Sequence, residues 1–214
     1  MQRETLKNLI ILEGGIAAGK TTLLKALAEQ YGFFAIEEPV VNNPFLELFY
    51  ADPPKYAYPF QMWFLEQRIG HYRQATEFAM NNPQTIVILD RSVFSDYVFA
   101  LNGYKDGIIS EEQFGCYMEK YTAAVTELPQ PSAMLYLDVP PEVCLYRIQN
   151  IRKRACEQGI PLCYLQGIHD CYAELMSQMQ QIGCRTVVVD WSEFGSVEDI
   201  YQHCSTVTEV AAFE

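Results

Sequence analysis

The stretch Gly14-Gly15-Ile16-Ala17-Ala18-Gly19-Lys20-Thr21-Thr22 decides the fold of this chain. It follows the apolar run Leu9–Leu12 and precedes the helix-prone run Leu23–Ala28, which is the context that the pattern G-x-x-x-x-G-K-[ST] requires. Glycines let successive backbone N–H groups face one phosphate, and the start of the helix adds a positive dipole. A simple turn of small residues would need neither the Lys20 ammonium nor the Thr21 hydroxyl, which can bind Mg²⁺. The stretch therefore predicts a loop that binds a nucleoside triphosphate.

Composition narrows the remaining possibilities. The 214 residues fit one domain, 1–214, and no apolar run is long enough to cross a membrane. The N-terminus reaches an apolar strand too soon for a signal peptide. A net charge of −12 argues against a nucleic-acid partner, because such partners are held by phosphate neutralisation. The seven cysteines form no C-x-x-C pair and are odd in number, which favours reduced thiols in the cytoplasm over zinc or disulfides.

Five apolar runs indicate the strands of an α/β fold. They lie at 9–12, 33–36, 85–89, 133–137 and 186–189, and helical patterns separate them. This alternation predicts a parallel sheet of five strands that is covered on both faces. Four runs are soon followed by acids, namely Glu37 and Glu38, Asp90, Asp138 and Asp190. Since ligands bind at the carboxyl ends of parallel strands, these acids fall on the functional edge.

Two further patterns predict helices. Ser110-Glu111-Glu112-Gln113 is a capping box, and a long helix from about 55 to 80 is bracketed by Pro53-Pro54 and Asn81-Asn82-Pro83. Apolar residues also recur at helical spacing from Leu165 to Ile182. We interpret that stripe as core or subunit packing, because such stripes rarely bind cofactors.

Glu38 and Asp90-Arg91 are the candidates for chemistry. Pro39 biases Glu38 towards an extended backbone, from which its carboxylate can take a proton from an attacking hydroxyl. Asp90 directly follows a strand and can hold Mg²⁺, while Arg91 can stabilise a phosphoryl group in flight. Taken alone, Glu38 would be read as a solvated loop acid. For Asp90-Arg91 the alternative is a surface ion pair, but the position of Asp90 directly after the run 85–89 favours function.

Two polar sets suggest a base site and a lid. Gln61 and Arg68 share a helix face and can read the edge of a planar base, with Asp96 placed to pair with Arg68. Arginines on a mobile segment over the phosphates would act as a lid, for which the candidates are Arg147, Arg152 and Arg154. A solvated basic helix end is the alternative for that patch.

Together these pieces resemble the deoxyribonucleoside kinase family, which includes deoxycytidine, deoxyguanosine and bacterial deoxyadenosine kinases. The resemblance covers nearly the whole chain and implies a P-loop kinase fold with an Arg-rich lid at about 150–160. It rests on segments whose order and spacing are jointly specific: the loop 14–22, Glu38-Pro39-Val40, Asn43-Pro44-Phe45-Leu46, Phe49-Tyr50, Phe60-Gln61, Arg68, Asp90-Arg91-Ser92-Val93-Phe94-Ser95-Asp96, Phe99-Ala100, Arg152 with Arg154, and Glu157-Gln158-Gly159-Ile160-Pro161-Leu162.

The resemblance also implies a role for each matching residue. Acceptor-side roles are a general base on the 5′-hydroxyl (Glu38), contacts to the sugar 3′-hydroxyl (Tyr50, Glu157), base reading (Gln61, Arg68, Asp96), base stacking (Phe99) and shaping of the base pocket (Phe64). Donor-side roles are phosphate binding (residues 14–22 with Lys20 as a catalytic charge), Mg²⁺ binding (Thr21, Asp90), a position between the reacting groups (Arg91), the lid (Arg147, Arg152, Arg154) and contact with the donor base (Glu193, Phe194).

The expected activity is Mg²⁺- and ATP-dependent 5′-phosphorylation of a deoxyribonucleoside by a homodimer. The Arg68/Asp96 pair and the bulk of Phe64 favour deoxyadenosine, then deoxyguanosine, then deoxycytidine. Two alternatives stay open. A thymidylate-type monophosphate kinase would need cations where Glu38 stands, and a non-catalytic subunit with the kinase fold would not need the complete set of catalytic residues.

Overall fold

The computed structural model describes residues 4–38 and 43–212, within which five strands form one fully parallel sheet. The strand order is β2-β3-β1-β4-β5, so β1 lies in the centre and the glycine-rich loop follows directly from it. The strands are β1 (Thr5–Gly14), β2 (Phe34–Ile36), β3 (Val87–Asp90), β4 (Gln130–Asp138) and β5 (Arg185–Asp190). The predicted α/β class and the five parallel strands are confirmed.

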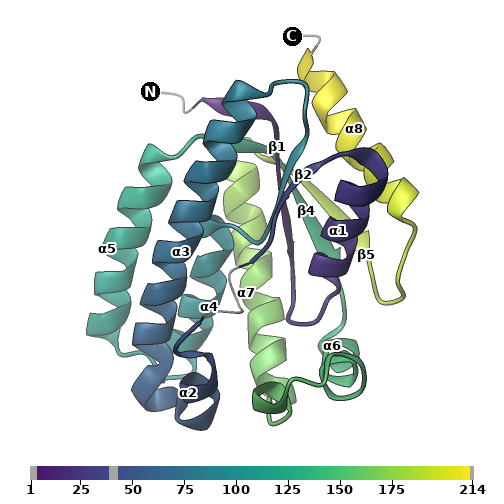
Figure 1. Ribbon diagram of the computed structural model, residues 1–214. Helices are drawn as coiled ribbons and strands as arrows, with labels where there is room; N and C mark the ends of the chain where they lie inside the picture. The colour runs from purple at the N-terminus through teal and green to yellow at the C-terminus, as the bar shows by residue number, and fades with distance from the viewer. Residues whose placement is uncertain (1–3, 39–42, 213–214) are drawn as a thin grey trace.

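Helices cover the two faces of this sheet unequally (Figure 1). One face carries α1 (Lys20–Tyr31) and α8 (Val197–Ala212), and the other carries a thicker layer in which α5 lies outermost. The thicker layer contains α3 (Pro53–Asn81), α4 (Val93–Lys105), α5 (Glu111–Glu127) and α7 (Leu162–Gln181). None of the described helices is both long and apolar enough to cross a membrane.

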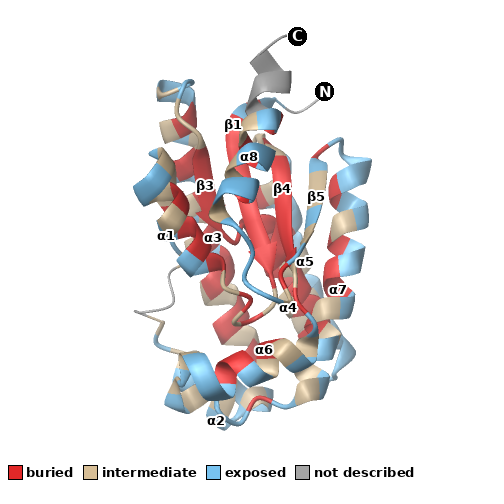
Figure 2. Cartoon of the chain, turned by 90° about the vertical axis from the view of Figure 1, so that its right-hand side faces the viewer, coloured by how far each residue is buried: buried red, intermediate tan, exposed pale blue. Residues whose placement is uncertain are grey.

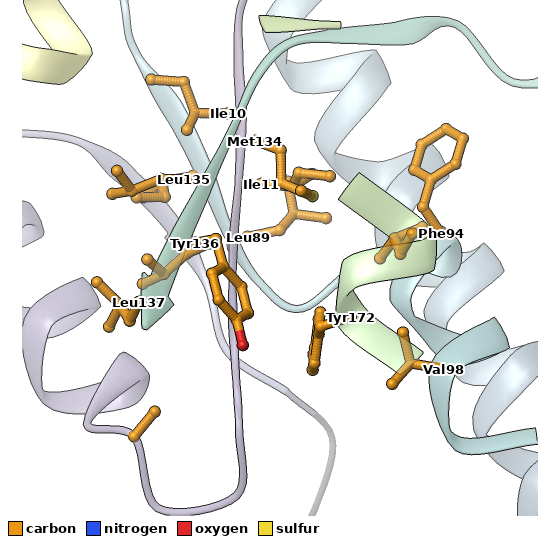
Figure 3. Close-up of a cluster of buried hydrophobic side chains, with 14 of the residues drawn as sticks. Ile10, Ile11, Leu89, Phe94, Val98, Met134, Leu135, Tyr136, Leu137 and Tyr172 are labelled. Atoms are coloured by element: carbon orange, nitrogen blue, oxygen red, sulfur yellow. The ribbon is translucent and has the colours of Figure 1, made fainter. Parts of the chain in front are cut away.

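The core lies where the central strands meet these helices (Figure 2). Leu9, Ile11 and Leu12 of β1 are fully buried, and they belong to one large cluster with residues of β3, β4, α4 and α7. Figure 3 shows part of this cluster between the sheet and the helices. The edge strand β5 differs from the prediction of a sheet covered on both faces, because its Val188 is 54 % exposed.

Local sequence signals explain where several helices begin and end. Ser110 caps α5 by accepting from the Gln113 backbone N–H at 3.2 Å, and the Gln113 side chain accepts from the Ser110 N–H at 3.0 Å. The predicted capping box is thus present. The predicted stripe on α7 is buried within the chain itself from Leu165 to Met179, whereas Ile182 is 37 % exposed.

Short elements gather at the carboxyl edge of the sheet, below the strands in Figure 1. They are α2 (Leu46–Ala51), α6 (Pro141–Arg147), a π-helical turn η1 (Ile148–Arg152) and a 3₁₀ turn η2 (Ala155–Glu157). Between η1 and η2, Lys153 has a left-handed backbone with φ 51°. All the predicted site residues therefore surround one end of the sheet.

Candidate active site

The glycine-rich loop has the tight geometry of a phosphate cradle. Gly14 has φ 148°, and a Cβ atom there would lie 2.8 Å from the carbonyl oxygen of Leu137, so only glycine fits. Lys20 Nζ donates to the carbonyl oxygens of Gly14 at 3.1 Å and Gly15 at 2.8 Å. Burial, reinforced by the nearby Arg91, lowers the pKa of Lys20 to about 8. The loop therefore holds a buried cation that a phosphate would stabilise.

Thr21 and Asp90 form the candidate metal pair. The Thr21 hydroxyl donates to Asp90 Oδ2 at 2.5 Å, while Asp90 Oδ1 is buried and has no hydrogen-bond partner among the described residues. Burial raises the pKa of Asp90 despite the opposing charge of Lys20. The described residues contain no group of three or more His, Cys, Asp or Glu side chains suited to a metal. Mg²⁺ in phosphoryl-transfer sites takes only one or two protein oxygens, so this pair fits it.

Glu38 lies between two arginines just beyond β2. Arg68 Nη2 donates to Glu38 Oε1, and Arg91 Nε donates to Glu38 Oε2 at 3.2 Å. Burial opposes ionisation of Glu38, but the positive charges of Arg91, Arg68 and Lys20 outweigh it and lower its pKa to about 2. Glu38 is therefore a carboxylate at every physiological pH. Pro39, which was expected to extend the backbone here, lies outside the described residues.

Asp96 organises the end of the site that holds the predicted base-reading residues. It is fully buried and accepts from Gln61 Nε2 at 2.8 Å, from the Tyr117 hydroxyl at 2.9 Å and from Arg68 Nη1. The predicted pairing of Asp96 with Arg68 is present. The sequence did not identify Tyr117 as part of the site, because nothing in its spacing reveals a hydroxyl aimed at Asp96.

Two phenylalanines form the walls of this end. The Arg68 guanidinium carbon lies 4.6 Å from the ring centroid of Phe64 and 5.4 Å from that of Phe99. The guanidinium carbon of Arg91 lies 4.7 Å from the Phe99 centroid. Such stacking fixes both guanidinium planes. The two rings thus constrain a slot suited to a flat ligand.

Two arginines of the predicted lid, Arg152 and Arg154, pair with Glu157. Arg152 Nη2 and Arg154 Nη1 lie 3.0 Å and 3.2 Å from Glu157 Oε1, and Glu157 itself is buried. Tyr50 of α2 lines the same cavity as Glu157. Burial, with Tyr164 and Glu157 nearby, raises the pKa of Tyr50, so its hydroxyl stays protonated and can donate. The two predicted sugar contacts are therefore brought together.

Arg147 differs from the other two arginines of the predicted lid. It ends α6 and is buried, donating Nη1 to the carbonyl of Ala18 at 3.0 Å and Nη2 to those of Trp191 and Ser192, each at 2.9 Å. Its guanidinium carbon lies 4.2 Å from the ring centroid of Phe194. Arg147 thus ties the phosphate loop to the segment after β5, whereas Glu193 is exposed there.

Two adjoining cavities run through these residues and share Glu38, Arg91 and Arg152 in their walls. The larger is lined by Ala17, Ala18, Gly19, Lys20, Thr21 and Thr22 together with Asp90, Arg147, Arg154 and Phe194. The other is lined by Tyr50, Gln61, Phe64, Arg68, Phe99, Glu157 and, contrary to its assignment to the phosphates, Ile16. One cavity is thus basic and follows the loop, and the other is aromatic and polar.

Sequence reasoning missed two buried residues next to this junction. Glu13 accepts from the Ser92 hydroxyl at 2.7 Å and from the Tyr172 hydroxyl at 3.2 Å. A signal for Glu13 existed, since it directly follows the apolar run 9–12, so that an acid stands after this run as well as after the other four. For Tyr172 there was none, because it sits within an apolar stripe.

Comparison with known proteins identifies the family. The family model "Deoxynucleoside kinase" matches residues 10–212. The chain belongs to the deoxynucleoside kinase family. It is 45 % identical over 189 residues to deoxyguanosine kinase of Dictyostelium discoideum. The matched region covers 88 % of this chain and 66 % of the Dictyostelium protein. The predicted kinase fold and the predicted enzyme class, a deoxynucleoside kinase that uses ATP, are thereby confirmed.

The chain is also similar to a solved kinase structure and to a protein that carries a different name. A solved structure of deoxyadenosine kinase from M. mycoides with bound dATP superposes with a TM-score of 0.79 at 25 % identity, covering 92 % of this chain and 98 % of that one. The protein named NADH dehydrogenase [ubiquinone] 1 alpha subcomplex subunit 10 of Bos taurus is 30 % identical over 185 residues. That match covers 77 % of this chain and 53 % of the bovine protein.

Proposed function

We propose that this chain transfers the γ-phosphate of ATP to the 5′-hydroxyl of a purine deoxyribonucleoside, at the junction of the two cavities. The observation that carries the proposal is that Glu38 and Arg91 line both cavities and contact each other. A carboxylate and a guanidinium at one junction suit the two needs of phosphoryl transfer, which are to receive a proton and to stabilise charge on the moving group.

The donor triphosphate would lie along the glycine-rich loop. Lys20 would release the carbonyls of Gly14 and Gly15 and bind the outer phosphates instead. Thr21 and Asp90 would hold Mg²⁺, which neutralises charge on the phosphates when bound. Phe194, over Arg147, offers a flat surface for the donor base, and the exposed Glu193 would lie beside it.

The acceptor would lie in the aromatic cavity. Phe64 and Phe99 would contact the faces of the base, while Gln61 and Arg68, aligned by Asp96, would bind its edge. Gln61 uses its amide N–H groups on Asp96 Oδ2 at 2.8 Å and the Asp96 carbonyl at 3.1 Å, which leaves its Oε1 facing the ligand as an acceptor. Tyr50 and Glu157 would bind the 3′-hydroxyl. The base order that we propose is deoxyadenosine, deoxyguanosine and then deoxycytidine.

Glu38 would accept the proton of the 5′-hydroxyl. Its low pKa makes it a weak base, but the loose transition state of phosphoryl transfer needs little activation of the attacking oxygen before the bond to phosphorus forms. Orientation of that oxygen by a charged acceptor is then the main contribution. Arg91 would stabilise the charge on the transferred group.

Initial rates against the four deoxyribonucleosides, each with ATP or GTP as donor, test this proposal. We expect purines to give the highest kcat/KM. Parallel assays with the four monophosphates separate the thymidylate-type alternative, since Glu38 would repel the acceptor phosphate there. Phosphorylation of monophosphates alone would contradict the proposal.

The similarity to a subunit of bovine NADH dehydrogenase is the finding that favours the alternative of a non-catalytic subunit with the kinase fold. The clustering of five side chains around a single junction argues against this alternative; they are Lys20, Thr21, Glu38, Asp90 and Arg91. A protein that serves only as a structural subunit has no need of all five. Absence of any nucleoside or nucleotide phosphorylation with Mg²⁺ and ATP would favour this alternative.

The wider setting is also part of the proposal. We take 1–214 as a single domain with its lid at about 150–160, acting as a cytoplasmic homodimer. The seven cysteines, all free thiols, support a reducing compartment. The dimer rests on the family resemblance, because the apolar stripe of α7 is largely used inside the chain. Light scattering of the purified protein tests it, and a mass near 24.5 kDa would contradict it.

A further inference from the structure

Glu13 is a buried carboxylate that the proposed chemistry does not use. It precedes the last residue of β1 and is 0 % exposed among the apolar side chains of the central strands. Burial raises its pKa above the usual value for a glutamate, against the attraction of Arg91. A carboxylate in such a place is costly unless its oxygens are satisfied. Both are, by the hydroxyl groups of Ser92 and Tyr172.

Tyr172 links this carboxylate to the active site. It lies on α7, is fully buried, and its ring packs beside Tyr136 with 5.0 Å between ring centroids (Figure 3). Its hydroxyl donates to Glu13 Oε2 at 3.2 Å and accepts from Arg91 Nη1 at 2.5 Å. Burial raises the pKa of Tyr172, so the hydroxyl keeps its proton. The path from Glu13 to Arg91 is therefore two consecutive hydrogen bonds.

Arg91 is held from three sides at the junction. Besides Nη1 on Tyr172, its Nε binds Glu38 at 3.2 Å and its Nη2 donates to the Gly15 carbonyl at 3.3 Å. The contact between Arg91 and Glu38 is the one that must change during a turnover, since the Glu38 carboxylate receives the proton of the 5′-hydroxyl of the nucleoside. The contact to Tyr172 takes no part in that exchange.

We propose that Glu13 and Tyr172 are positioning residues that keep Arg91 at the junction while Glu38 is engaged by the acceptor hydroxyl. This inference rests on the proposed function. A protonated Glu38 attracts Arg91 less, and the hydrogen bond from Arg91 to the Tyr172 hydroxyl, which the buried Glu13 side chain orients, then keeps the guanidinium in place. Ser92, the residue that caps α4, holds the far oxygen of Glu13 and anchors the relay to the helix.

Two tyrosine variants separate positioning from simple stability. Tyr172→Phe removes the hydroxyl and keeps the ring, and Tyr72→Phe makes the same change at another fully buried tyrosine, whose hydroxyl donates to the Pro129 carbonyl at 2.9 Å. We expect Tyr172→Phe to lower kcat about tenfold, with KM for nucleoside and ATP within about twofold, as for a lost hydrogen bond to a charged group. Tyr72→Phe should leave kcat unchanged, whatever each variant does to the urea midpoint.

A double-mutant cycle then tests whether Glu13 acts through Tyr172. Glu13→Gln should lower kcat by a similar factor, and the double variant should lose no more than either single variant. Equal kcat values for wild type and Tyr172→Phe would overturn the proposal, as would independent, multiplying losses in the cycle.

A readout without turnover keeps this test separate from the proposed function. In ¹⁵N-labelled protein, the Nε–H resonance of Arg91 should shift or broaden in Tyr172→Phe and stay in place in Tyr72→Phe. An inactive wild type that still shows this change would contradict the proposed function and leave the relay intact. An unmoved resonance in Tyr172→Phe would contradict the relay.

Discussion

Arg68 donates to Glu38, so a residue that lines the aromatic cavity also fixes the carboxylate at the junction of the two cavities. The same guanidinium binds Asp96 through its other terminal nitrogen. One rigid group therefore spans from the proposed base contact to the proposed proton acceptor. Any base that displaces Arg68 also moves Glu38, which couples base selection to the rate of transfer rather than to binding alone.

Replacing Glu38 by Gln should lower kcat by ~10²–10⁴-fold while nucleoside binding stays nearly intact, because the amide cannot accept the proton. Steady-state rate assays measure the change in kcat, and calorimetry measures the affinity for the nucleoside. Glu66→Gln is the matched control, since Glu66 is exposed on α3 and lies 3.7 Å from Lys120. An unchanged kcat in Glu38→Gln would remove Glu38 as the base.

The lowered pKa of Lys20 predicts an alkaline limb in the rate profile. Phosphate binding needs the protonated ammonium, and the protonated fraction falls as pH rises through the pKa of about 8. We expect kcat/KM for ATP, which reports the free enzyme, to fall above that pH. In contrast, kcat should stay level there, because bound phosphates raise the Lys20 pKa again. A flat kcat/KM profile up to about pH 9.5 would contradict this, since a Lys of ordinary pKa near 10.4 behaves in that way.

The orphaned oxygen of Asp90 predicts a defect in metal use. Asp90→Asn should raise the Mg²⁺ concentration for half-maximal rate by ~10–100-fold, as for loss of a group that binds or orients a metal ligand. Mg²⁺ titrations at fixed ATP measure this. Asp138→Asn is the control, because Asp138 ends β4, which β1 separates from β3, and pairs with His169 at 3.1 Å instead. If the two variants reach half-maximal rate at the same Mg²⁺ concentration, Asp90 does not belong to the metal site.

Glu157 predicts how the enzyme selects the sugar. In Glu157→Gln, the preference for a deoxynucleoside over its 2′,3′-dideoxy analogue should shrink by ~10–100-fold, because a hydrogen bond to a charged acceptor is lost. The ratio of the two kcat/KM values is the measurement. Glu174→Gln is the control. Glu174 is an exposed residue of α7 that pairs with Lys105 of α4, so this variant should keep the wild-type ratio. If the ratio survives in Glu157→Gln, the 3′-hydroxyl is read elsewhere.

Two helical glycines predict opposite effects on stability. A Cβ on Gly167 of α7 would lie 2.1 Å from Asn102 Oδ1 of α4, so Gly167→Ala should lower the free energy of unfolding by ~1–3 kcal/mol. A Cβ on Gly115 of α5 meets no atom within 4 Å, so Gly115→Ala should raise it by ~0.4–1 kcal/mol. Urea unfolding measures both. Equal changes in the free energy of unfolding would mean that α4 and α7 have room for a methyl group between them at Gly167.

The sequence predicts the layout of this fold well, because apolar runs report strands directly. Its errors lie at strand ends: β2 and β3 begin at Phe34 and Val87, later than the runs suggest, while β4 and β5 extend to Asp138 and Asp190. Apolar residues such as Phe33 are buried without joining a ladder, so hydrophobicity alone does not mark where pairing begins.

The site is predictable where a residue follows a strand or belongs to a motif. Glu38, Asp90 and Lys20 were found in that way. Tyr117 and Tyr172 were not, because their hydroxyl groups reach Asp96 and Glu13 only once α5 packs against α4 and α7 packs onto the sheet. Helical spacing identifies a buried face but carries no information about the partner of a single polar atom within it.

Arg91 has a left-handed backbone, with φ 66°. A residue other than glycine in this region holds strain of ~1–3 kcal/mol, which surrounding contacts must offset. Arg91→Gly would relax the main chain but delete the guanidinium that Glu38 and Tyr172 both bind. Because removing one partner of a buried ion pair costs about 3–5 kcal/mol, the contacts of the guanidinium outweigh the strain of the backbone that carries it. A screen that selects for heat resistance alone should therefore keep arginine at position 91, although nothing in such a screen requires turnover.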